Sequence, residues 1–80
     1  MMTVHVKLFA TLRRFYPELG VGQALPVELP EGATVGDLVR RLRLPSDHVK
    51  VIFVNGIVRD EVHPLADGDE VGIFPPVGGG

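Results

Sequence analysis

Four stretches of the chain have the residue pattern of β-strands. Three alternate apolar and polar residues, as strands with one buried face do, and one is almost continuously apolar. In chain order they are residues 4–9, 24–29, 50–54 and 70–74. Asn55-Gly56 favours a type I′ hairpin into a further short strand at Ile57-Val58. Pro26 places the second strand at a sheet edge, because proline has no backbone N–H to donate to a neighbouring strand.

Two helices are predicted between these strands. Residues 10–16 carry apolar side chains at helical spacing, and Pro17 ends this short segment. The main helix begins at Val35, because Thr34 and Asp37 have the spacing of a capping box. Its apolar positions repeat every three or four residues, arginines follow near its end, and Pro45 terminates the segment.

The order of these elements predicts an α+β domain with the β-grasp architecture. In that architecture a mixed five-stranded sheet wraps one main helix, with a short helix between the first two strands. A ferredoxin-like split βαβ arrangement is the alternative, but it needs two full-length crossover helices. We expect a single domain over residues 1–74 and a projecting tail over residues 75–80.

Composition excludes several kinds of chemistry. The chain has 80 residues, a formal net charge of −2 and no cysteine. It therefore has no disulfide, thiolate metal site or cysteine nucleophile. It also lacks the basic excess that a nucleic-acid partner would require. No apolar run is long enough for a membrane span, and we expect a cytoplasmic protein.

The titratable residues do not form a recognisable catalytic or metal site. His5, His48 and His63 lack the spacing of metal ligands, and Asp60 and Glu61 are adjacent in the chain, not facing each other across a cleft. We expect no catalytic group, no metal and no bound cofactor. Five arginines could form a basic patch for an acidic partner, although solvated helix faces explain them more simply. They are Arg13, Arg14, Arg40, Arg41 and Arg43.

The last seven residues are unusual for a fold element. Pro75-Pro76 stops the last strand and directs the chain away from the sheet, and Gly78, Gly79 and Gly80 offer no side chain to bury. Such a thin segment suits insertion into a narrow site on another protein. The reactive group at its tip is the carboxylate of Gly80, which must be activated, for example as an acyl-adenylate, before a nucleophile attacks.

The chain resembles the MoaD/ThiS family of ubiquitin-like sulfur carriers, and most of all its MoaD branch, the small subunits of molybdopterin synthase. The opening, the entry to the main helix, the hairpin and the approach to the last strand all carry the resemblance. Those motifs are residues 6–13, 30–38, 54–56 and 67–71. The Phe-Pro-Pro-Val sequence of residues 74–77, running into glycines, is the most specific. Gly78 departs from the MoaD pattern, which commonly has a small residue before two glycines.

The resemblance implies that an ATP-dependent adenylating enzyme activates Gly80 and that a sulfur donor converts it to a thiocarboxylate. The tail, with Gly78 and Gly79, would then enter the large catalytic subunit of molybdopterin synthase (MoaE-like), which uses the sulfur to build molybdopterin. ATP and the sulfur donor would serve the activating partner. The surface around Phe74, with Pro75, Pro76 and Val77, is expected to dock both partners.

Other functions stay open at this stage. Similar carriers supply sulfur for thiamine, cysteine, the tungsten cofactor or tRNA, and some are conjugated to lysines as protein modifiers. A non-catalytic interaction module resembling TGS domains is an alternative of another class, because Leu29 to Val35 resembles a TGS turn.

Overall fold

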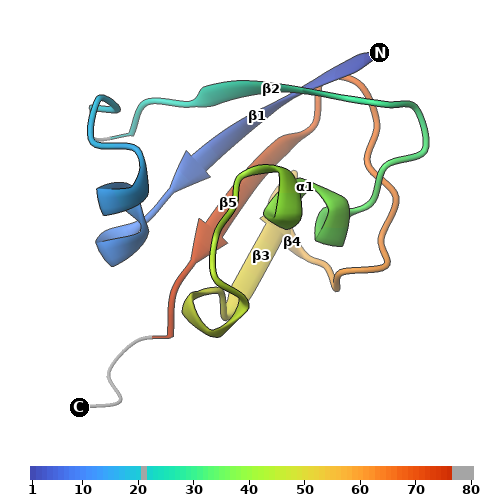
Figure 1. The fold of residues 1–80 in the computed structure, drawn as a ribbon. Coiled ribbons are helices and arrows are strands. Elements are labelled where there is room, and N and C mark those ends of the chain that lie inside the picture. Colours follow the sequence, from blue (N-terminus) through green and yellow to red (C-terminus); the bar gives the residue numbers. More distant parts are fainter. Residues whose placement is uncertain (21, 77–80) are drawn as a thin grey trace.

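A computed structural model describes residues 1–20 and 22–76 of the chain. Its strands form one five-stranded sheet in the order β2-β1-β5-β3-β4 (Figure 1). The central pair β1 and β5 is parallel, and all other pairs are antiparallel. The strands are β1 (Met2–Leu8), β2 (Leu25–Leu29), β3 (Val51–Val54), β4 (Ile57–Val58) and β5 (Glu70–Phe74). The predicted β-grasp architecture is therefore confirmed, with β2 at an edge as Pro26 indicated.

The helix α1 (Val35–Arg41) lies across one face of the sheet (Figure 1). It begins where the sequence predicts, because the Thr34 hydroxyl accepts from the Asp37 N–H at 3.2 Å and the Asp37 carboxylate accepts from the Thr34 N–H at 2.9 Å. The Thr34 backbone N–H, followed by the Arg40 guanidinium and the Thr34 side chain, lowers the pKa of Asp37. The capping box therefore favours the ionised carboxylate.

The connections differ in detail from the prediction. Residues 10–16 were expected to form a short helix, and the structure has the 3₁₀ helix η1 (Ala10–Phe15). A second 3₁₀ turn, η2 (Ser46–His48), has no clear periodicity in the sequence. α1 ends at Arg41, four residues before Pro45, and Arg43 has a left-handed backbone with φ 59°. The Tyr16 hydroxyl donates to the Leu42 carbonyl at 3.0 Å, which links η1 to the end of α1.

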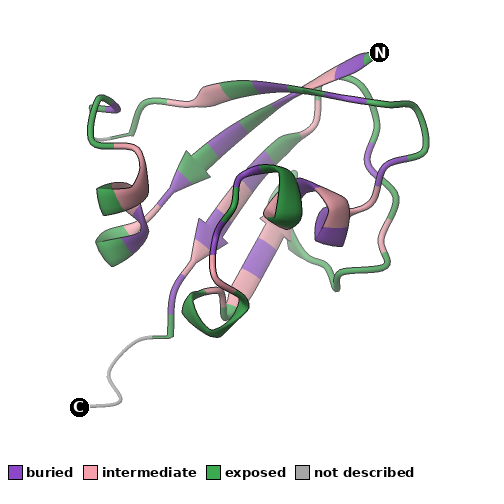
Figure 2. Cartoon of the chain, viewed as in Figure 1, coloured by how far each residue is buried: buried purple, intermediate pink, exposed green. Residues whose placement is uncertain are grey.

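The core lies between α1 and the sheet, as the purple segments of Figure 2 show. The apolar residues of β1 alternate with exposed ones, so Val4, Val6 and Leu8 are buried against the helix. Gly36 lets the helix approach the 59–69 loop closely, because a Cβ there would lie 3.2 Å from the Glu61 carbonyl oxygen. Backbone hydrogen bonds from Val35 to His63 and from Gly36 to Glu61 fix this contact.

Candidate functional site

The sheet has a second face, opposite α1, that no helix or loop of the described residues covers. Residues paired side by side on neighbouring strands point to the same face, so the register defines its rows. One row runs Lys7, Gly72, Phe53 and Val58 across four strands. The next row on this face lies nearer the end of β5. It contains Phe74, which is paired with Val51, and Phe9, which directly follows β1.

Three phenylalanines cluster on this face. The Phe9 and Phe74 rings stack with centroids 4.2 Å apart, and the Phe53 ring meets Phe74 edge-to-face at 5.5 Å. Gly72 lies beneath them, and a Cβ there would come within 3.2 Å of the Phe9 ring. Glycine at this position therefore lets the rings lie flat on the sheet. We name Phe9, Phe53, Gly72 and Phe74 the aromatic face.

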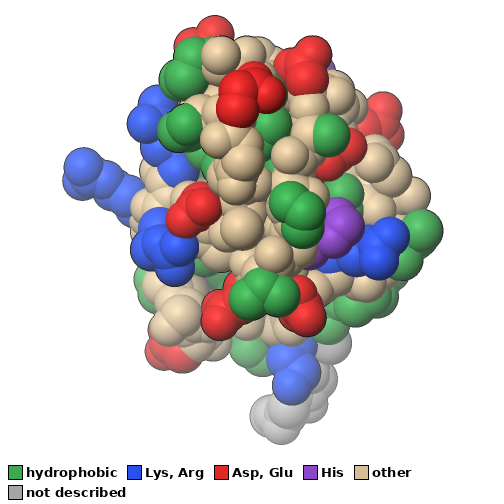
Figure 3. All heavy atoms as spheres, turned by 90° about the vertical axis from the view of Figure 1, so that its right-hand side faces the viewer, with side chains coloured by type: hydrophobic (Ala, Val, Ile, Leu, Met, Phe, Trp, Pro, Cys, Tyr) green, Lys and Arg blue, Asp and Glu red, His purple; other side chains and the backbone are tan. Residues whose placement is uncertain are grey.

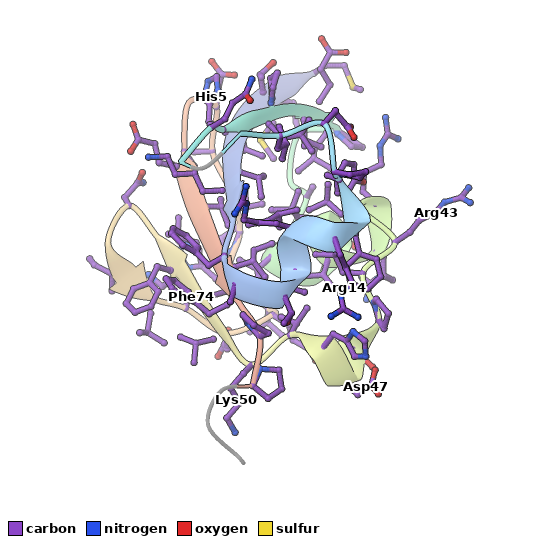
Figure 4. The ribbon with its side chains drawn as sticks, turned by 90° about the vertical axis from the view of Figure 1, so that its left-hand side faces the viewer. His5, Arg14, Arg43, Asp47, Lys50 and Phe74 are labelled. Atoms are coloured by element: carbon purple, nitrogen blue, oxygen red, sulfur yellow. The ribbon has the colours of Figure 1, made fainter. Side chains whose placement is uncertain are left out.

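The aromatic face occupies the end of the sheet from which the chain leaves β5. At the other end the same face is polar, with His5 and Glu70 paired across β1 and β5. Figure 4 shows this separation, since Phe74 lies near the chain end and His5 at the opposite end of the sheet. A hollow of about 620 Å³ spans the boundary and includes Lys7 and the three phenylalanines in its lining. Partly exposed aromatic residues around a hollow are typical of protein interfaces.

The predicted docking residues differ in how far they are buried. Phe74 is half-buried at the centre of the aromatic face, Pro75 is buried, and Pro76 is exposed. Val77, Gly78, Gly79 and Gly80 lie outside the described residues.

Sequence analysis missed Phe9, Phe53 and Gly72 as members of the site. A signal for the first was present, because Phe9 continues the outward alternation of His5 and Lys7. Phe53 was hidden in a continuous apolar run, which does not show which residues face the helix. The role of Gly72 depends on two rings from different parts of the chain and has no local signal.

The other candidate residues do not assemble into a site within residues 1–20 and 22–76. In these ranges no group of three or more histidine and acidic residues could hold a metal ion. His5 and His48 are exposed, and Asp60 and Glu61 lie on the surface as expected. The described helices include none long and apolar enough to cross a membrane.

The five arginines do not form one patch. Arg40 pairs with Asp37 on α1, while Arg14 lies on η1 near Asp47 and Arg43 points away from the body of the molecule (Figure 4). Acidic, basic and hydrophobic side chains are interspersed on the side of the molecule that Figure 3 shows.

Comparison with known proteins identifies the family. The ThiS family model matches residues 6–80, nearly the whole chain. The chain belongs to the ThiS family. It is thus a ubiquitin-like sulfur carrier of the MoaD/ThiS group, a family of small carrier proteins, and the predicted resemblance is confirmed.

Three relatives, each similar to nearly the whole chain, carry two kinds of name. A Pyrococcus furiosus protein named as molybdopterin converting factor subunit 1 is 34% identical, with a TM-score of 0.78 over 96% of this chain and 100% of its own. Small archaeal modifier protein 3 of Haloferax volcanii is 35% identical over 99% of this chain and 100% of its own. Small archaeal modifier protein 1 of Haloferax volcanii is 27% identical, with a TM-score of 0.77 over 96% of this chain and 100% of its own.

Proposed function

We propose that this ThiS-family carrier supplies sulfur for molybdopterin as the small subunit of a synthase. The observation that carries the proposal is the 34% identity to the Pyrococcus furiosus protein named as molybdopterin converting factor subunit 1, across all of that chain. The Phe-Pro-Pro-Val sequence of residues 74–77, which runs into glycines, supports the same branch. The large catalytic subunit of the synthase would receive the tail, and the pterin precursor bound to that subunit would accept the sulfur.

The chemistry is assigned to the carboxylate of Gly80. A carboxylate with a pKa of about 3.5 is ionised at neutral pH and resists nucleophiles. In the proposed first step one of its oxygens attacks the α-phosphate of ATP in the adenylating enzyme, forming an acyl-adenylate and releasing pyrophosphate. Sulfur from a donor, at the oxidation level of sulfide, then attacks the carbonyl carbon and expels AMP, leaving a thiocarboxylate. Glycines at 78–80 give the least hindrance to both attacks.

Recognition is assigned to the aromatic face. A carrier without its own catalytic groups needs a surface that positions its tail in the partner's active site. The stacked rings of Phe9 and Phe74 lie where the chain leaves β5, so a protein that covers them also holds the start of the tail. Half-exposed aromatic residues bury a large apolar area with little loss of conformational freedom, which favours them as anchors.

Intact-protein mass spectrometry tests the proposal. The full chain and a chain lacking Gly80 are incubated with ATP, a sulfide source and the adenylating enzyme of the host. We expect a mass gain equal to replacement of one oxygen by sulfur, only in the full chain and located at its C-terminus. Adding the large synthase subunit and the pterin precursor should then return the mass to its starting value. No gain with an enzyme that activates another carrier would reject the proposal.

A protein modifier is the second candidate function. The 35% identity to small archaeal modifier protein 3 of Haloferax volcanii favours it. The same activated carboxylate of Gly80 would form an isopeptide bond with the amine of a target lysine, again expelling AMP or the sulfur. Tryptic peptides of a host lysate whose lysines carry residues 60–80, the remnant that cleavage after Arg59 leaves, would support this function. If these peptides were absent during sulfur limitation while the thiocarboxylate was present, the modifier function would be rejected and the carrier function would stand.

A further inference from the structure

A second recess lies beside the point where the chain leaves the domain. It has a volume of about 280 Å³ and is lined by Thr11, Arg14, Asp47, His48, Pro75 and Pro76. We name it the tail-root recess. Its walls come from η1, η2 and residues 75–76, which directly follow β5, so they come from three segments far apart in the sequence.

Backbone contacts hold these segments together. The Phe9 N–H donates to the Ile73 carbonyl at 3.1 Å, immediately before η1, and the Lys50 N–H donates to the Phe74 carbonyl at 2.8 Å, immediately after η2. The Phe15 ring meets the His48 ring edge-to-face at 5.7 Å, which joins η1 to η2. These contacts hold the walls of the recess in place, so the recess is a fixed part of the domain.

The charge around the recess differs from that of the chain. Arg14 and Lys50 are exposed cations, with Lys50 beside the chain exit, and Asp47 lies next to Arg14 in the lining of the recess (Figure 4). Among residues 1–20 and 22–76 neither cation has an ion pair within 4.0 Å, whereas Arg40 is paired with Asp37. A local positive excess thus stands at the tail root of a chain with a net charge of −2.

We infer that Arg14 and Lys50, at the tail-root recess, dock acidic side chains around the opening of the adenylating-enzyme site that receives the tail. This inference rests on the proposed function. Arg14 lines the recess with Pro75 and Pro76, and the Lys50 N–H donates to the Phe74 carbonyl, so a protein that holds the chain after Pro76 must approach both cations. Unpaired surface cations steer a complementary partner and raise its association rate more than they raise final affinity. Arg14 and Lys50 are therefore residues that set how fast the adenylating enzyme takes the tail.

Charge reversal tests the inference with a matched control. The variant Arg14→Glu/Lys50→Glu is compared with Arg41→Glu/Arg43→Glu, which changes the net charge equally at the end of α1. Association of each chain with the host adenylating enzyme is measured by stopped-flow fluorescence at about 50 mM and 500 mM salt. At low salt we expect the association rate of the first variant to fall about ten-fold and that of the control less than two-fold. At high salt the difference should shrink, because the Debye length falls to a few ångströms.

The outcomes separate this inference from the proposed function. Equal rates for the two variants would overturn it, and so would a loss that persists at high salt, because that would reflect damaged packing. Thermal unfolding of both variants checks the fold. A wild-type chain that binds the enzyme with this salt dependence but gains no sulfur would reject the proposed function and retain the inference. A wild-type chain that does not bind would overturn both.

Discussion

The rings of Phe9 and Phe74 lie 2° from parallel with centroids 4.2 Å apart, although the two residues are 65 positions apart in the sequence. Their strands, β1 and β5, are the parallel central pair of the sheet, and each phenylalanine stands at the end of its strand or directly after it. The stacked pair therefore exists only when the sheet is complete. It offers a partner a preformed apolar surface next to the chain exit, without further ordering on binding.

Phe74→Ala is expected to reduce activation of the chain far more than it reduces stability. Because Phe74 is only half-buried, its truncation should cost less stability than truncation of a core residue. It would, however, remove the ring that contacts both Phe9 and Phe53 at the centre of the aromatic face. Aromatic anchors at the centre of an interface typically cost about 2 kcal/mol or more when truncated, which is about thirty-fold in kcat/KM. The measurement is the rate of ATP-dependent pyrophosphate release with the adenylating enzyme over a range of carrier concentrations.

Val62→Ala is the matched control for Phe74→Ala. Val62 is 72% exposed and lies in the 59–69 loop, away from the aromatic face. We expect its kcat/KM to stay within two-fold of wild type. If the two variants had the same kcat/KM, the aromatic face would not be the docking surface.

Asn55 should contribute to stability in two separable ways. It has φ 52° in the hairpin turn, where most side chains are strained. Its side chain also donates to the Asp69 carboxylate at 2.9 Å and accepts from the Glu70 N–H at 2.9 Å. Asn55→Gly removes only the hydrogen bonds and should cost about 1 kcal/mol. Asn55→Ala adds backbone strain of about 1 kcal/mol and should cost more.

Urea unfolding of the two Asn55 variants measures this difference. We expect the order wild type, Asn55→Gly, Asn55→Ala in the free energy of unfolding. If Asn55→Ala were as stable as Asn55→Gly, the left-handed backbone would carry no strain at this position. If both matched wild type, the link from the hairpin to the start of β5 would be energetically neutral.

Most of the fold was predictable because its signals are local. The capping box at Thr34, the Asn55-Gly56 turn and the edge position of Pro26 each depend on a few neighbouring residues, and each is confirmed. The end of α1 was harder to place, because the Tyr16 hydroxyl that binds the Leu42 carbonyl comes from a distant segment. The extra length of β1 at Met2 likewise depends on its partner Leu29 in β2.

The candidate site was only partly predictable, because most of its contacts join segments that are distant in the sequence. Phe74 and Pro76 were found from a motif at the chain end, but the rings that surround Phe74 come from β3 and the end of β1. The tail-root recess combines η2, which has no clear periodicity, with Arg14 from η1. Nothing in the sequence distinguishes Arg14 from the four other arginines, because only the fold places it beside Pro76.

Leu38→Ala should be among the most destabilising single substitutions. Leu38 is fully buried on the sheet side of α1, so truncation leaves a cavity at the centre of the core. Such changes cost about 2–5 kcal/mol, and in a domain of this size each kcal/mol lowers the melting temperature by about 4–8 °C. Differential scanning calorimetry is the measurement. Arg41→Ala on the exposed side of α1 is the control and should move the melting temperature by only a few degrees.

The capping box makes helix stability depend on pH in a defined direction. The pKa of Asp37 is lowered in the folded chain, chiefly by the Thr34 backbone N–H and then by Arg40. A lowered folded pKa means that ionised Asp37 stabilises the fold above its unfolded pKa of 3.8. This contribution is lost as the pH falls through the lowered pKa that Asp37 has in the folded chain. Asp37→Asn should therefore be less stable than wild type at pH 7. The free energies of unfolding of the two proteins should converge once the pH is below the folded-state pKa of Asp37.

Chemical unfolding of wild type and Asp37→Asn at intervals between pH 7 and pH 2 measures this convergence. Thr34→Ala, which removes the reciprocal hydrogen bond from the Asp37 N–H, should cost about 1 kcal/mol at neutral pH. Its loss should vary less with pH, because the hydroxyl does not titrate. A constant gap between wild type and Asp37→Asn down to pH 2 would show that the charge of Asp37 contributes nothing. The start of α1 would then be held by the hydroxyl of Thr34 and by the Val35 and Gly36 contacts with the 59–69 loop alone.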